Sequence, residues 1–291
     1  MRATGSGAGC GNHWPDCNGI VVGASARTQT IIEFTHRMTS AVALLLVACL
    51  VIWCWRVTSN SDWARYSAMC AAVFMTNEAL LGAGLVLLDY VAQNKSVGRI
   101  LFLCLHFGNT LLLLAALSLT AAWLSRGGGS LRLAQSWQQA AAIGIGLLAT
   151  MAVGITGAIA ALADTLFRAT SLRTSLLLDF RGGAPLLLHL RLLHPPIAVI
   201  SACYVGWVIF RASMRENHLS RLAIVLIILL FAQAGIGMMN VLLLAPVWLQ
   251  IIHLFVADLL WITLVLASAD LLLERTPVRP RHTVPIPLSL G

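Results

Sequence analysis

Four histidines lie within long apolar segments of the chain, at positions His36, His106, His194 and His253. An imidazole inside a membrane is costly unless it is buried in a helix bundle and given a partner. The first and third each open an apolar segment, and the second and fourth each lie near the start of a later one. Paired imidazoles that face each other across a bundle are suited to bind a heme iron. The spacing therefore predicts two related heme sites.

The composition indicates that a membrane positions these histidines. Of the 291 residues, 59% are hydrophobic and only 10% are charged, unlike an ordinary soluble domain. A helix needs about 20 apolar residues to cross the core of a bilayer. We expect an all-α integral membrane protein with seven transmembrane helices over 30–55, 66–90, 99–125, 137–163, 186–210, 222–246 and 248–272. The net charge of +8 is interpreted as a sign of orientation and not of nucleic-acid binding.

Basic residues predict how the helices are oriented. The short loops on one side are almost purely basic, as at Arg56, Arg65 and Arg126, and such loops stay in the cytoplasm. We therefore expect a multi-pass protein of the plasma membrane, with its N-terminus outside and its C-terminus in the cytoplasm.

The two halves of the chain repeat the same order of features. Glu33-Phe-Thr-His36 aligns with Arg191-Leu-Leu-His194, and the segment that begins at Glu78 aligns with the one that begins at Gln233. We interpret the halves as two pseudo-repeated helix bundles. The predicted division is an outer loop with a cysteine pair at 1–29, a first-half bundle at 30–125, an inner linker at 126–136, a second-half four-helix bundle at 137–272 and a cytoplasmic tail at 273–291. Because the first half has one helix fewer, we expect a further helix upstream of residue 1, and the alternative is a natural protein of seven transmembrane helices.

Cys10 and Cys17 lie in a polar loop rich in turn-forming residues on the predicted outer side. A disulfide is permitted on that oxidising side. Closing so small a loop would contribute about 2.5 kcal/mol on the chain-entropy estimate. Two free thiols, a metal site with His13 and a redox-active pair are the alternatives, and all remain open at this point.

Several motifs resemble heme A synthase. The segment from Arg2 to Cys17 reads RATGSGAGCGNHWPDC and is followed by Glu33-Phe-Thr-His36-Arg37. Further matching features are Ala163-Asp164-Thr-Leu-Phe167, His194-Pro195 and His253. The resemblance covers nearly the whole chain. It implies a fold of eight transmembrane helices in two similar four-helix bundles, and oxidation of the C8 methyl of heme O to a formyl group, which gives heme A for terminal oxidases.

The resemblance also implies roles for the histidines and for Glu33. His194 and His253 would bind the iron of heme b, and His36 and His106 would form the substrate site for heme O. Glu33 lies three residues before His36 and shares its helix face. By spacing alone its carboxylate either accepts a proton or simply reaches water, and the resemblance favours a catalytic role.

Other charged residues in the apolar segments have less specific interpretations. Arg37 and Arg191 are candidates for contacts with heme propionates, because a guanidinium forks onto a carboxylate. Their alternative is to reach the membrane surface with the charged head. Glu78 and Asp258 are further acids within the predicted helices, and helix packing and proton movement both remain open for them.

Two other functions fit part of the pattern. A quinol-linked electron-transfer cytochrome with two bis-histidine hemes would use the same histidines, but it would not need Glu33 or the cysteine loop. A transporter with inverted repeats could use histidines as proton relays, but the two halves here are related as parallel repeats. The expected partners are heme O, the heme O synthase that supplies it, an unidentified electron donor and the lipid bilayer. No nucleic acid is expected, and a homo-oligomer stays open.

Overall fold

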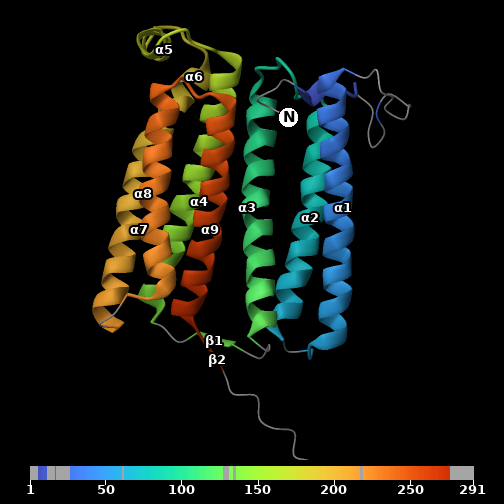
Figure 1. The fold of residues 1–291 in the computed structure, drawn as a ribbon, viewed down its shortest axis with the longest axis vertical. Helices are drawn as coiled ribbons and strands as arrows, with labels where there is room; N and C mark the ends of the chain where they lie inside the picture. The colour runs from blue at the N-terminus through green and yellow to red at the C-terminus, as the bar shows by residue number, and fades with distance from the viewer. Residues whose placement is uncertain are drawn as a thin grey trace, which may run out of the picture.

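Seven of the described helices stand side by side in two bundles in the computed structural model of the chain (Figure 1). The structure describes residues 6–11, 17, 27–60, 62–126, 131–133, 136–216 and 219–275. The first bundle contains α1 (Thr28–Val57), α2 (Trp63–Leu87) and α3 (Val97–Ser125). The second bundle contains α4 (Trp137–Leu166), α7 (His194–Glu216), α8 (Arg221–Leu242) and α9 (Val247–Leu272). These helices are long and apolar enough to cross a membrane, so the chain is a multi-pass membrane protein.

Different small elements mark the two ends of the bundles. At one end lie η2 (Ser6–Ala8), α5 (Leu172–Asp179) and α6 (Leu186–Arg191) (Figure 1). We call it the disulfide end, because Cys10, shortly after η2, forms a disulfide with Cys17. At the opposite end, the strand end, β1 (Leu131–Leu133) pairs antiparallel with β2 (Leu273–Arg275). These strands join the predicted inner linker to the first residues of the predicted tail. Residues 276–291 lie outside the described part of the chain.

The helices agree with the predicted spans, except at three turns. Helices α2 and α8 end at Leu87 and Leu242, earlier than the predicted spans 66–90 and 222–246. In both cases the following residues turn away with positive φ, at 55° for Asp89 and 58° for Leu244. The predicted span 186–210 is divided into α6 and α7, because His194 is followed by two prolines that cannot continue a preceding helix. Helix α5 was not predicted.

The turns after α2 and α8 reproduce the sequence repeat in three dimensions. Tyr90 donates its backbone N–H to Leu85 over 2.8 Å, and Ala245 donates to Asn240 over 2.7 Å. Each residue of the second pair lies 155 positions after its counterpart in the first. The two bundles are therefore copies of one helical plan at this point of the fold.

Helix α3 joins the two bundles, since it packs against α2 on one side and against α4 and α9 on the other. The contact with α9 includes a buried hydrogen bond in which Trp261 Nε1 donates to the carbonyl of Leu111 over 2.7 Å. At the strand end, Arg126 after α3 forms an ion pair with Asp270 of α9. The two bundles are thus fixed to one another near both the middle and the strand end.

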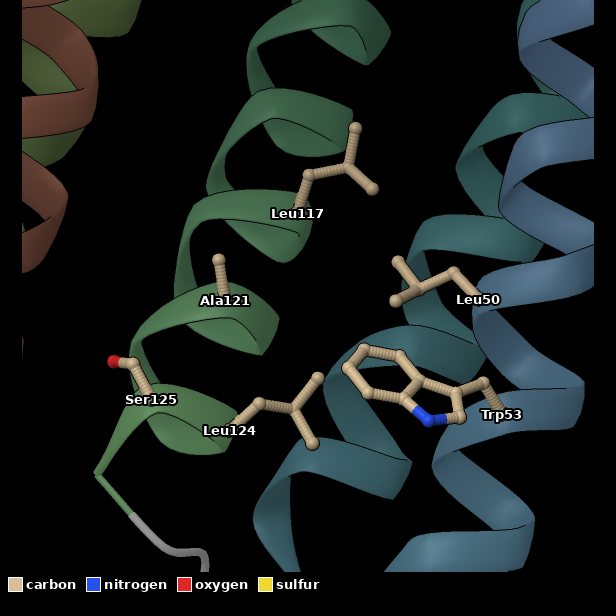
Figure 2. A pocket seen from close by; sticks show the side chains of 6 residues that line it. All are labelled: Leu50, Trp53, Leu117, Ala121, Leu124 and Ser125. Atoms are coloured by element: carbon tan, nitrogen blue, oxygen red, sulfur yellow. The ribbon is translucent and has the colours of Figure 1, made fainter.

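The bundles differ where α4 lies. In the second bundle α4 packs against both α7 and α9, the counterparts of α1 and α3. Between α1 and α3 the structure has instead a cavity of about 380 Å³. Figure 2 shows Leu50 and Trp53 of α1 pointing across it toward Leu117 and Leu124 of α3. The further helix expected from the sequence stays a prediction.

Candidate functional site

The four histidines of interest lie close to the starts of α1, α3, α7 and α9, and all four helices start at the disulfide end (Figure 1). His36 of α1 and His106 of α3 belong to the first bundle, and His194 of α7 and His253 of α9 belong to the second. The fold therefore places one of the two predicted pairs in each bundle.

In the second bundle, both imidazoles pack against a glycine of a neighbouring helix. A Cβ added at Gly157 of α4 would lie 3.0 Å from His194 Cε1, and one added at Gly237 of α8 would lie 3.2 Å from His253 Cε1. His194 Nδ1 is 3.3 Å from the hydroxyl of Thr156. The missing side chains at the two glycines leave the rings room next to the helix backbones.

In each bundle, the second histidine of the pair has one buried ring nitrogen that completes no hydrogen bond to any described atom. These nitrogens are Nδ1 of His106 and Nδ1 of His253. Buried polar atoms in a protein are normally paired. In the first bundle, Gly82 lies beside His106, with its added Cβ 3.9 Å from Cε1. His36 is exposed. Each half thus offers imidazoles that the described residues leave incompletely partnered.

These imidazole pairs fit heme. A porphyrin already supplies four nitrogens to its iron, so two histidines complete the coordination. Among the described residues, no group of three or more histidine, cysteine or acidic side chains is arranged to hold a metal ion alone. Two imidazoles in each bundle, of which His106, His194 and His253 lie beside a glycine, therefore match the requirement of a bis-histidine heme.

We expect Gly157→Ala to weaken heme binding in the second bundle. The new methyl would press on the His194 ring at 3.0 Å, and a displaced ligand of this kind costs about tenfold in metal affinity. Heme content and the absorption spectrum of the purified protein would measure the loss. Gly144→Ala is the control on the same helix, because nothing lies within 4 Å of its added Cβ. Equal heme loss in both variants would contradict the proposed ligand position.

Glu33 is fully buried at the disulfide end of α1. Its Oε2 accepts a hydrogen bond from the backbone N–H of Cys10 over 3.0 Å. Its Oε1 accepts from Arg37 over 2.6 Å, one turn further along the helix. Two donors therefore hold the carboxylate in place, and burial separates it from water.

The cysteine loop reaches Glu33 because it packs closely on α1. Cys10 and Cys17 are joined by a disulfide, with their Cα atoms 4.5 Å apart. Gly9 permits the approach, since an added Cβ would lie 2.6 Å from the backbone of Gln29. The hydroxyl of Thr30 donates to the carbonyl of Gly9 over 2.8 Å. His13 and Arg2, which also entered the sequence argument, lie outside the described residues.

The disulfide can be checked by counting thiols. Of the seven cysteines in the chain, five are free in the structure. The denatured protein should therefore react at five thiols without reductant and at seven after reduction. Cys10→Ser should leave Cys17 free and destabilise the loop by about 2.5 kcal/mol, whereas Cys203→Ser should leave the bridge intact. Seven reactive thiols before reduction would exclude it.

The two arginine candidates have carboxylate partners in the structure. Arg37 pairs with Glu33. Arg191 of α6 donates to Asp164 at the end of α4 over 2.7 Å and also pairs with Asp179 of α5. The sequence argument did not predict either pairing, since the aspartates are 27 and 12 positions away from Arg191. Contacts between these arginines and heme propionates stay a prediction.

Comparison with known proteins places this geometry in a family. Residues 1–265 match the cytochrome oxidase assembly protein family. A protein of Thermus thermophilus named protoheme IX farnesyltransferase is 44% identical over 276 residues, which are 94% of this chain and 45% of that protein. Heme A synthases of Alkalihalophilus pseudofirmus and Geobacillus kaustophilus are 36% and 37% identical over 119 residues, which are 41% of this chain and 37% and 35% of theirs.

The chain spans less than half the length of each of these relatives. The family match, by contrast, extends over most of the chain and includes both histidine pairs, Glu33 and the cysteine loop. The chain therefore belongs to the cytochrome oxidase assembly protein family, the family of the heme A synthases.

Proposed function

We propose that the chain acts as a heme A synthase-type oxidoreductase, which oxidises the C8 methyl of heme O to a formyl group. One observation carries the proposal. Both bundles hold an imidazole pair at the disulfide end. Three residues before its first histidine, the first half has a buried carboxylate, Glu33, whereas the second half has Arg191 at that position. The arrangement suits one reacting site and one site that only carries electrons.

The histidines would divide between substrate and cofactor. His36 and His106 would hold heme O, and His194 and His253 would bind the iron of a resident heme b. When bound, the hemes would supply the redox chemistry, while the protein provides position and electrostatics.

Glu33 would accept a proton from the reacting group. Cys10 and Arg37 orient its carboxylate through their donors, and a fixed carboxylate in a buried place is a suitable base. At the repeat-related position the second half has Arg191, which cannot accept a proton. The asymmetry supports an acid–base role in the first half alone.

The electron-transfer cytochrome is the main rival. It would account for the four histidines, but not for a cysteine loop whose backbone binds a buried glutamate. A transporter is less well supported. The matching turns after α2 and α8 show that the two halves are parallel repeats, whereas the rival transporter has inverted repeats. These alternatives are distinguished by the product that the chain makes.

Similarity to a protein named protoheme IX farnesyltransferase supports a heme O synthase as a partner of this chain. A farnesyl transfer to protoheme supplies the kind of heme that this chain would oxidise, so we propose that a heme O synthase delivers the substrate. The electron donor stays unidentified. We also propose that the disulfide end faces outside, where a disulfide persists, and that the strand end with Arg126 faces the cytoplasm.

The test is chromatography of hemes extracted from membranes of a host that accumulates heme O and expresses this chain. We expect a new heme A peak that an empty-vector host lacks. Retained heme b with unconverted heme O would instead indicate an electron-transfer cytochrome. A purified chain without any heme would favour the transporter.

A further inference from the structure

Glu78 is an acid of α2 that the proposed reaction does not use. Its side chain is only 18% exposed, and two residues of α3 hold its carboxylate. Asn109 donates its amide to Oε2 over 2.6 Å, and the hydroxyl of Thr110 donates to Oε1. The Asn109 amide also donates to the carbonyl of Phe74 over 2.8 Å. The carboxylate is thus fixed in one orientation between two helices.

The fixed carboxylate faces a heme-site histidine. Glu78 Oε1 lies 3.4 Å from Nδ1 of His106. That nitrogen is buried and has no completed hydrogen bond among the described residues. When an imidazole binds a metal through one nitrogen, its other N–H normally needs an acceptor, which fixes the ring and raises its basicity. A small rotation of the His106 ring would supply this bond.

The second bundle has a neutral side chain at the position that corresponds to Glu78. Gln233 lies 155 positions after Glu78, as Gly237 does after Gly82. The Gln233 amide Nε2 is 3.3 Å from Nε2 of His253, whereas Glu78 faces Nδ1 of His106. The two glycines lie beside the two histidine rings. The position is repeated, but a neutral amide stands in place of the carboxylate and contacts the other ring nitrogen.

We propose that Glu78 is a positioning residue that makes the first-bundle heme more reducing than the second. Its carboxylate accepts the Nδ1–H of His106 and makes that imidazole the stronger donor to iron, so the oxidised iron is favoured. Gln233 gives His253 no such charge. The inference rests on the proposed function, because it requires a heme between His36 and His106.

The experiment exchanges the two side chains. Glu78→Gln and Gln233→Glu are made separately in the chain purified with its hemes from a host that accumulates heme O. Each midpoint potential is followed by absorbance in a redox titration, and the first-bundle signal is identified by its loss in His106→Ala. We expect Glu78→Gln to shift the first-bundle potential in the positive direction and Gln233→Glu to shift the second-bundle potential in the negative direction.

Asp89→Asn is the matched control, because it removes an exposed acid from the same bundle at the turn after α2. It should move neither potential. An unchanged first-bundle potential in Glu78→Gln would overturn the proposal. If that variant does not accumulate, Gln233→Glu decides, and an unchanged second-bundle potential then overturns it.

Failure of the proposed function would look different. If His106→Ala has the same heme content and spectrum as the wild-type chain, no heme is bound at the first-bundle site. The proposed function itself would then be wrong. A first-bundle heme that is present and titrates, with a potential independent of residue 78, would refute the role of Glu78 alone.

Discussion

Replacing His194 by alanine should remove the second-bundle heme and leave the protein in the membrane. Alanine offers no ligand atom, and it is a good helix former, so α7 should still begin at this position. Because one of two hemes loses an axial ligand, heme content should fall to about half. Pyridine hemochrome content and the low-spin absorption bands of the purified protein would measure the change. His253→Ala should give the same result, since the two residues form one pair.

His189→Ala is the control for this change. His189 is exposed on α6, five residues before His194, and is not placed at either pair. Its removal should leave the heme content unchanged. Full heme retention in His194→Ala would exclude the ligand assignment, and equal loss in His189→Ala would point to general damage at the disulfide end.

The long helices could be predicted because their signal is local. Hydropathy and length identify each span without knowledge of its neighbours, and the structure places helices at all seven. The turn at Asp89 could not be predicted in the same way, since a non-glycine residue with φ of 55° leaves no clear mark in the sequence. Helix α5 was missed because its eight residues are too short for a membrane span and lie between longer apolar segments.

The histidine pairs were predictable because the sequence repeats, whereas their surroundings were not. The N–H that binds Glu33 comes from Cys10, 23 positions earlier, and depends on how the loop folds over α1. Likewise, the carboxylate beside His106 comes from Glu78 on another helix. Such contacts are set by helix packing, which local sequence patterns do not specify. The sequence therefore predicted the candidate side chains, but their hydrogen-bond partners depend on the fold.

Glu33→Gln should stop heme A formation and leave both hemes bound. The amide has nearly the shape of the carboxylate and can still accept the hydrogen bond from Cys10, so the loop and α1 should keep their contact. It cannot accept a proton. Loss of a positioned base lowers turnover by roughly 10²- to 10⁴-fold. Product yield by heme chromatography, read together with heme content, would measure the effect.

Two further variants separate an effect on catalysis from an effect on folding. Asp270→Asn removes an acid at the strand end, where it pairs with Arg126, and it should leave turnover unchanged. Arg37→Gln removes one of the two donors to Glu33, so it should lower turnover less than the loss of the carboxylate does. Normal heme A yield from Glu33→Gln would refute the role of Glu33 as a base. In that case the buried carboxylate would serve to anchor the cysteine loop, and Glu33→Ala would free the loop without any further effect on the chemistry.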